Sequence, residues 1–291
     1  MNDAKIVVTV AVTGAVGDKS KHPELPVTPK EIADSALDAY SDGASVAHIH
    51  VRDVKTAEAS MDLDLYREVV ERIRDNSDMI INLTTGAGAR IIPDGSNPVG
   101  LGPGTTWSSP EKRAEHIVAL KPELCSLDVG SVNFGPRVFA NIVPHVEEMA
   151  KLIQEAGTKP ELEVFDLGHI RIANALIDKG LVDRPPIFQL CLGIPWGISA
   201  SSKNMLVMKE ALPPDAIWCG FAIGQDSFSM AAQSVLLGGN IRVGFEDNFY
   251  LARGRKAKSN AELVRKTVHI LNALDREPAS PAEARQILRL T

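Results

Sequence analysis

Residues 45–51 read Ser-Val-Ala-His-Ile-His-Val, an apolar run whose length and composition predict a buried β-strand. Side chains alternate along a strand, so His48 and His50 are expected on the same face. Two imidazoles at this spacing suit a metal ion that takes neighbouring nitrogen ligands. One packed and one half-exposed structural histidine would give the same pattern, and the rest of the chain must decide between the two interpretations.

This strand lies between two predicted helices. Residues 28–42 begin with Thr28 as N-cap, Pro29 at the first helical position and Glu31 completing a capping box. Residues 62–75 follow the strand and carry apolar residues at i, i+4 and i+8, as one buried helix face requires. The histidine strand therefore belongs to a strand-helix repeat.

The same alternation continues along the whole chain. The predicted strands cover residues 6–12, 45–51, 79–84, 124–129, 161–165, 187–192, 217–223 and 241–245, and each is followed by a predicted helix. Eight such units indicate an α/β fold, a (β/α)8 barrel, with residues 1–291 as a single domain and a short C-terminal helical extension over residues 278–290. An open doubly wound sheet is the alternative, but no GxGxxG follows the first strand.

Composition narrows the classes of protein. The 291 residues are 44% hydrophobic and 23% charged, which is typical of a globular protein, and the net charge of −6 argues against nucleic acid as a partner. The three cysteines form no CxxC motif, which indicates reduced thiols. Neither a leader with a long apolar region nor an apolar stretch near the ~18 residues of a membrane span is visible. We expect a soluble cytoplasmic protein.

Barrel enzymes carry their active sites at the carboxyl ends of the strands, where this sequence places many polar residues. Glu246 follows the eighth strand and is the most plausible third ligand, since two imidazoles and a carboxylate leave coordination positions open for a substrate. Zinc is favoured, although the same ligands suit Fe(II), and a cap at the strand end would be the non-functional interpretation of Glu246. Other polar residues at strand ends are Asn82, Thr84, Thr85, Asp128, Ser131, Asn133, Glu161, Glu163, Asp166, Arg242 and Asp247.

Three groups of basic residues are candidates for binding anions. They are Arg52, Arg242 and the basic loop of residues 253–258, Arg-Gly-Arg-Lys-Ala-Lys, which follows the last strand and could meet the phosphates of a nucleotide-bearing cosubstrate. The remaining histidines favour structural roles: His116, His145 and His269 fall within helices, and His169 is placed to cap one.

Several motifs together resemble the β-keto acid cleavage enzyme family. They are residues 13–15 (TGA), 25–33 (LPVTPKEIA), 48–53 (HIHVRD), 84–86 (TTG), 130–135 (GSVNFG), 161–166 (ELEVFD), 238–248 (GGNIRVGFEDN) and 277–284 (EPASPAEA). The resemblance implies a Zn²⁺-dependent barrel, a dimer or tetramer of identical chains, that reacts a β-keto acid with acetyl-CoA to give acetoacetate and a new acyl-CoA.

The resemblance also implies roles for individual residues. The metal positions are His48, His50 and Glu246, and Asp247, Arg242 and the hydroxyl of Thr84 occupy the acid-base positions. The expected substrate-binding residues are Thr85, Ser131, Asn133, Glu163 and Val16.

Three departures from the family pattern bear on specificity. Val16 stands where a family member that takes an amino-substituted keto acid has a glutamate, so we expect an apolar or neutral substrate tail to be preferred to a primary amine. The loop 87–107 is long and could form a lid or decorate the rim. Gly224-Gln225 replaces an expected Gly-Arg.

Two other classes of protein remain open at this stage. A metal-dependent aldolase, hydrolase or Fe(II) enzyme could use the same three ligands, and a non-catalytic barrel that binds a metabolite could keep a metal for structure alone.

Overall fold

A computed structural model describes residues 5–97 and 99–290 of the chain. Within them, parallel strands close into a barrel, with β13 hydrogen-bonded to β1. The barrel strands are β1 (Val8–Ala11), β2 (Val46–Ile49), β5 (Ile80–Thr84), β7 (Leu124–Asp128), β10 (Lys159–Val164), β11 (Ile187–Leu192), β12 (Ile217–Ala222) and β13 (Asn240–Val243). The predicted (β/α)8 barrel is confirmed, and closure excludes the open sheet.

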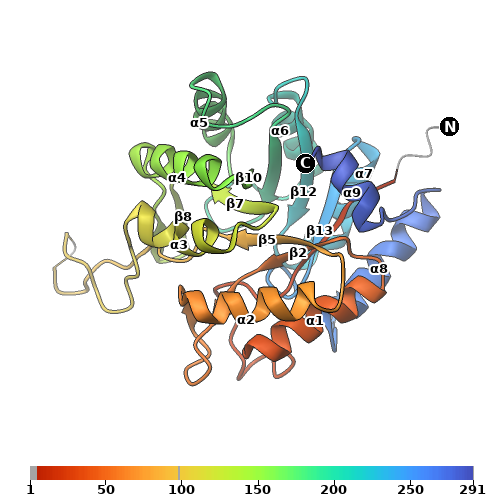
Figure 1. Cartoon of the computed structure of the whole chain (residues 1–291), viewed down its shortest axis with the longest axis horizontal. Coiled ribbons are helices and arrows are strands. Elements are labelled where there is room, and N and C mark those ends of the chain that lie inside the picture. The colour runs from red at the N-terminus through yellow and green to blue at the C-terminus, as the bar shows by residue number, and fades with distance from the viewer. Residues whose placement is uncertain (1–4, 98, 291) are drawn as a thin grey trace.

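Helices surround this barrel (Figure 1). They are α1 (Pro29–Ser41), α2 (Leu63–Arg74), α3 (Pro110–Leu120), α4 (Val143–Ala156), α5 (Leu167–Asp178), α6 (Ser202–Glu210), α7 (Ser227–Leu236) and α8 (Asn260–Ala273). The predicted capping box begins α1: the Thr28 hydroxyl accepts from the Glu31 amide at 3.2 Å, and the Glu31 carboxylate accepts from the Thr28 amide at 2.9 Å.

Short sheets extend the loops that follow the barrel strands, and they differ from the predicted strand boundaries. The predicted strand 45–51 divides at His50, because β3 (Val51–Arg52) leaves the barrel to pair with β4 (Ala59–Ser60). The segment 86–107 contains β6 (Arg90–Ile91), which joins β9 (Arg137–Phe139) and β8 (Val132–Phe134) in a small antiparallel sheet. A hairpin of β14 (Tyr250–Ala252) and β15 (Arg255–Lys256) holds the basic loop.

The amino ends of the strands form a closed floor. Val7, Val46, Ile80 and Leu124 form one apolar cluster with residues of the C-terminal helix α9 (Pro281–Leu288). The chain before β1 pairs with the segment before α9, since the Ile6 amide donates to the Glu277 carbonyl at 2.9 Å. None of the helices in the described ranges is long and apolar enough to cross a membrane.

Above the floor the barrel interior becomes polar. The period of two along each strand places His48 above Val46, Asn82 above Ile80 and Ser126 above Leu124, and all three polar residues are buried. The strands therefore carry apolar side chains at one end and chemically active ones at the other.

Candidate active site

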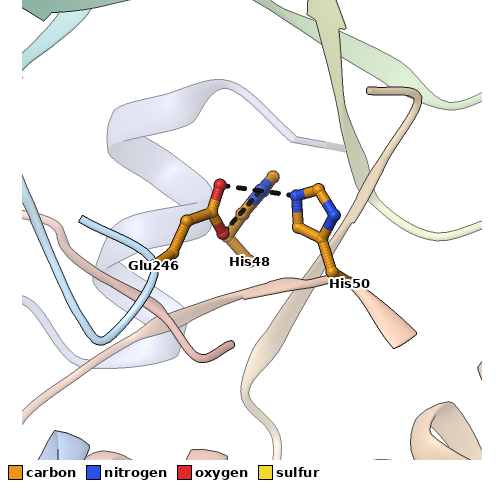
Figure 2. Close-up of side chains that lie close together, drawn as sticks. All are labelled: His48, His50 and Glu246. Carbon is orange, nitrogen blue, oxygen red and sulfur yellow. Dashed lines mark ion pairs between the residues drawn. The ribbon is translucent and has the colours of Figure 1, made fainter. Parts of the chain in front are cut away.

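Two histidines and one glutamate converge at the carboxyl ends of β2 and β13 (Figure 2). The His48 Nε2 lies 3.5 Å from one carboxylate oxygen of Glu246, and the His50 Nε2 lies 3.4 Å from the other. The possible ligand atoms of the three residues all lie within 4.8 Å of one another. Residues nearly 200 positions apart in the chain thus form one group.

Glycines allow Glu246 to reach the histidines. A Cβ on Gly244 would lie 2.1 Å from the Ala11 carbonyl oxygen, and a Cβ on Gly14 would lie 2.6 Å from the Glu246 side chain. Gly244 therefore permits close backbone contact between β1 and the turn after β13.

The donor set fits a divalent metal ion. One carboxylate oxygen of Glu246 is buried without a hydrogen-bond partner among the described residues. Burial lowers the pKa of His48 to about 4, so this imidazole is neutral near pH 7, as a metal ligand must be. Two histidines and one carboxylate suit zinc and Fe(II) alike, so the geometry supports a metal site without selecting the ion.

Arg242 connects the acidic residues of the site. Its guanidinium donates to both carboxylate oxygens of Asp247 at 3.0 and 2.9 Å, to Glu246 at 2.8 Å and to Glu163 at 3.2 Å. It also lies over the ring of Phe221, 4.2 Å from the centroid. Burial opposes its charge, yet Asp247, Glu246 and Glu163 raise the pKa of Arg242 well above its usual value. Arg242 therefore stays cationic and fixes the orientation of Asp247.

Three further carboxyl groups have raised pKa values because they are buried. Burial raises the pKa of Asp247 to about 6 although Arg242 opposes the shift, and it raises the pKa of Glu163 well above its usual range. Burial also raises the pKa of Asp128 to about 6 against the charge of Arg113. Asp128 lines the cavity, and we gave it no role from sequence. The sequence could have indicated this position, because Asp128 lies two residues after Ser126 on β7 and the two side chains therefore share a face.

Thr84 faces the cavity, and neighbouring groups hold it. Its hydroxyl accepts from the Gly86 amide at 2.9 Å, and its carbonyl bonds the His116 Nε2 at 2.7 Å. His116 is itself buried and stacks on Tyr66 with ring centroids 4.0 Å apart. This packing makes His116 a support for Thr84.

Three of the expected substrate-binding residues do not line this cavity. Thr85 donates its hydroxyl to the Ser126 carbonyl at 2.8 Å, and the Ser131 hydroxyl accepts from the Asn141 amide at 2.8 Å. Asn133 is exposed on β8. Glu163 and Val16 do line it, with Val16 at the rim and 59% exposed. Contact of the first three with substrate stays a prediction.

Arg52 has a structural role in place of the anion-binding role considered from the sequence. Its N–H groups donate to the Thr13 hydroxyl at 2.8 Å and to the carbonyls of Thr13, Gly14, Gly17 and Ala57 at 2.7 to 3.0 Å. The side chain is 1% exposed. Arg52 therefore fixes the loop after β1 that carries Val16.

His169 is structural, but it does not cap the helix as predicted, because Asp166 is the N-cap of α5 and its carboxylate accepts from the Leu167 amide at 2.7 Å. The His169 Nδ1 accepts from the Phe165 amide at 3.2 Å, and its Nε2 lies 3.2 Å from the Ser131 carbonyl. It ties the loop after β7 to the loop after β10.

The long segment 87–107 contributes its base to the cavity. Ala87, Gly88, Arg90 and Thr106 line the cavity, while the middle of the segment reaches away from the barrel at the left of Figure 1. Aromatic residues of the barrel and of the segments that follow its strands complete an apolar wall, namely Phe134, Phe139, Phe165 and Phe221. The site is thus a charged base under a largely apolar wall.

A closed (β/α)8 barrel with an arginine-held aspartate and three potential metal ligands at its carboxyl ends belongs to the class of barrel enzymes. The chain belongs to the beta-keto acid cleavage enzyme family, whose model matches residues 5–290.

Characterised relatives match over nearly the full length. The chain is 40% identical over 293 residues to 3-dehydrocarnitine:acetyl-CoA trimethylamine transferase of Rhizobium meliloti, covering 99% of this chain and 97% of that protein. It is 37% identical over 288 residues to 3-keto-5-aminohexanoate cleavage enzyme of Fusobacterium nucleatum, covering 98% of each. The apo structure of ObcA shares the fold with a TM-score of 0.78 and 20% identity, over 92% of this chain and 66% of that one. The predicted family is confirmed.

Proposed function

We propose that this protein converts a β-keto acid and acetyl-CoA into acetoacetate and a new acyl-CoA, with Zn²⁺ held by His48, His50 and Glu246. One observation carries the proposal: the three ligands share a cavity with Asp247, which Arg242 holds by two hydrogen bonds. Family membership and the acetyl-CoA named for the Rhizobium relative support the reaction type.

The carbon atoms of the substrates and products show which bonds must form and break. Acetoacetate contains the acetyl group and a CH₂–COO⁻ unit, which must come from C1 and C2 of the keto acid. C2 therefore loses a proton and its carbanion attacks the thioester carbonyl. The CoA thiolate released by this attack then adds to the former keto carbon, C3. The C2–C3 bond breaks, and the proton first taken from C2 returns to C2, which completes acetoacetate. The remainder of the keto acid leaves as the acyl-CoA.

Asp247 is the base that this sequence of steps needs. A carboxylate with a pKa near 6 is ionised at neutral pH and remains basic enough to accept a proton from C2. The two hydrogen bonds from Arg242 fix its direction, and the Thr84 hydroxyl, which lines the same cavity, is placed to donate to a developing oxyanion. Zinc would polarise the keto carbonyl as a Lewis acid and so acidify C2.

The first residue to consider for specificity is Val16. An apolar side chain at the rim offers no counter-charge to an ammonium group, so we propose a substrate that lacks the 5-amino group of 3-keto-5-aminohexanoate. We further expect a cytoplasmic homo-oligomer. Sedimentation of the purified protein would measure the number of subunits.

A labelling experiment tests the reaction. Protein loaded with Zn²⁺ receives acetyl-CoA labelled in the acetyl group together with a panel of β-keto acids that carry cationic, neutral and anionic tails. We expect label in acetoacetate and unlabelled acyl groups in the new acyl-CoA. An aldolase, a hydrolase or an Fe(II) enzyme would give products without dependence on CoA, and a non-catalytic barrel would give none; either result would reject the proposal.

Two neighbouring substitutions separate the metal from the base. Glu246→Gln removes a ligand and should lower bound zinc as well as turnover. Asp247→Asn should leave bound zinc unchanged and lower kcat by about 10²- to 10⁴-fold, since only the base is lost. Loss of zinc in both variants, or activity in Asp247→Asn equal to the parent protein, would remove Asp247 from this role.

A further inference from the structure

Two arginines line the cavity without an acidic partner. Arg90 lies on β6 and Arg137 on β9, and both border the same cavity as His48 and His50. The ion pairs found in the described residues include neither Arg90 nor Arg137, whereas Arg242 deeper in the cavity has three acidic partners. A guanidinium that borders a cavity and has no acidic partner can donate to a bound anion there.

The small antiparallel sheet places the two arginines on one face. Arg90 is the cross-strand partner of Phe139, and Arg137 lies two residues before Phe139 on the same strand. Cross-strand partners and residues two apart share a face, so both guanidinium groups project toward the side that Phe139 presents to the cavity. The sheet forms only because the segment after β5 folds back onto the β8–β9 hairpin.

The surroundings of the pair hold it in place and leave its donors free. The Arg137 guanidinium lies over the Phe134 ring, 5.1 Å from the centroid, which orients a plane of N–H groups without using them. The Arg90 Nε is buried and has no hydrogen-bond partner among the described residues. Burial and the neighbouring charge of Arg90 both lower the pKa of Arg137, and no carboxylate opposes them.

We propose that Arg90 and Arg137 form an oxyanion-binding subsite of this cavity. Two chemical groups of the reaction present the required oxygens: a carboxylate at the far end of the β-keto acid, or a phosphate of acetyl-CoA. Two guanidinium groups repel each other unless an anion lies between them, and carboxylates and phosphates match their planar donor arrangement. This inference rests on the proposed function for the identity of the ligands. Val16 disfavours an ammonium group on the substrate, and the two arginines would in addition favour a negatively charged group.

Binding measured without turnover tests the subsite independently of the reaction. Calorimetry compares coenzyme A with pantetheine, which lacks the phosphates, and a β-keto diacid with a neutral keto acid of equal length. Arg90→Gln and Arg137→Gln should each weaken binding of one anionic ligand by about 10- to 100-fold and leave its neutral counterpart unchanged. Arg137→Lys should retain part of the affinity.

The control is Arg74→Gln, which removes the same charge from an exposed position on α2 outside the cavity. Selective loss of diacid binding assigns the subsite to the substrate tail, and selective loss of coenzyme A binding assigns it to the cosubstrate. The proposal would be overturned if the glutamine variants bound both anionic ligands as tightly as Arg74→Gln does. It would also be overturned if a cationic keto acid bound more tightly than the diacid. Because these are affinities, an enzyme that fails to release acetoacetate would reject the proposed function and leave this test intact.

Discussion

The two ends of the barrel are built from the same strands and have opposite chemistry. At the amino ends, Val46, Ile80 and Leu124 pack against α9 in an apolar floor. Two to four residues further along these strands, the inward positions hold His48, Thr84 and Asp128. Because the period of a strand is two, the same backbone geometry presents both sets of side chains. Stability and function can therefore be separated along the barrel axis.

The difference also appears in how each end balances its charges. The floor is stabilised mainly by apolar burial, and its ion pair between Arg285 of α9 and Glu123 is partly exposed. At the open end the buried guanidinium of Arg242 pairs with Glu163, Glu246 and Asp247, and Asp128 lies near a second buried guanidinium, that of Arg113. Such an excess of carboxylates is costly in a buried site unless a cation joins it. The carboxylates of the open end therefore favour a bound cation, whereas the floor consists mainly of apolar contacts within the chain.

Arg242→Met tests the charge balance of the open end and should have the largest effect. Three carboxylates lose their cation, so we expect the free energy of unfolding to fall by about 3–5 kcal/mol in protein stripped of metal. Acetoacetate release should fall by about 10³-fold, since Asp247 also loses its positioning.

Urea unfolding and initial rates measure the two effects of Arg242→Met. Arg242→Lys is the comparison, because it restores a charge without the two parallel hydrogen bonds to Asp247. A methionine variant as stable as the parent protein would show that the carboxylates are protonated together and need no cation.

Leu288→Ala tests the closed end. Leu288 of α9 is 4% exposed within the floor cluster, and truncation should cost about 2–4 kcal/mol through the cavity it leaves. The kcat/KM of the folded variant should remain within about twofold of the parent value, because α9 packs against the amino ends of the strands, at the opposite end of the barrel from the site. Leu206→Ala, at a position 39% exposed on α6, provides the control with a small effect on stability. A large change in kcat/KM for Leu288→Ala would show that the two ends are coupled.

The pH dependence of stability should come from the open end. Burial lowers the pKa of His116 to about 4 from an ordinary value of 6.5, so between these values the unfolded chain binds the proton and the folded chain does not. Stability from this group is therefore lost as the pH falls from 6.5 toward 4. When the pH is lowered from 7 to 4.5, the free energy of unfolding of His116→Gln should rise by about 2–3 kcal/mol relative to that of the parent protein. Leu288→Ala should keep the parent slope, and urea unfolding at both pH values compares the variants.

Glu31→Gln should give the smallest effect, at the start of α1. Although burial opposes it, hydrogen bonds from the Thr28 and Val27 amides lower the pKa of Glu31 to about 2. The carboxylate therefore stabilises the folded state above the unfolded pKa near 4.5, and this contribution is lost as the pH falls toward 2. Loss of the capping box should cost about 1 kcal/mol at pH 7 and very little at pH 2, measured by thermal unfolding. An equal cost at both pH values would contradict the role of the charge.

Sequence periodicity predicted what depends on local spacing. The eight strand-helix units, the common face of His48 and His50, and the capping box at Thr28 all follow from residues close in the chain. Glu246 could be proposed because strand ends meet at one rim of a barrel.

Features that depend on loop pairing lay beyond the sequence. The donors of Arg52 reach backbone carbonyls whose positions only the folded loop defines. Arg90 and Arg137, 47 residues apart in the chain, lie on one face of a small sheet whose formation no periodic pattern in the sequence predicts. Gly244 likewise reflects the approach of β1, which its own neighbours in the chain do not reveal.

The hydrogen bond between Ile6 and Glu277 has a consequence for how the protein is made. A ribosome delivers the strand at residue 8 long before the helix at residue 281, so the first strand emerges without the segment that covers its amino end. Until then Val7 and its apolar neighbours face water or other chains. The nascent barrel thus passes through an interval in which its floor is open to chaperones and to misassembly, and packing of α9 after release of the chain ends that interval.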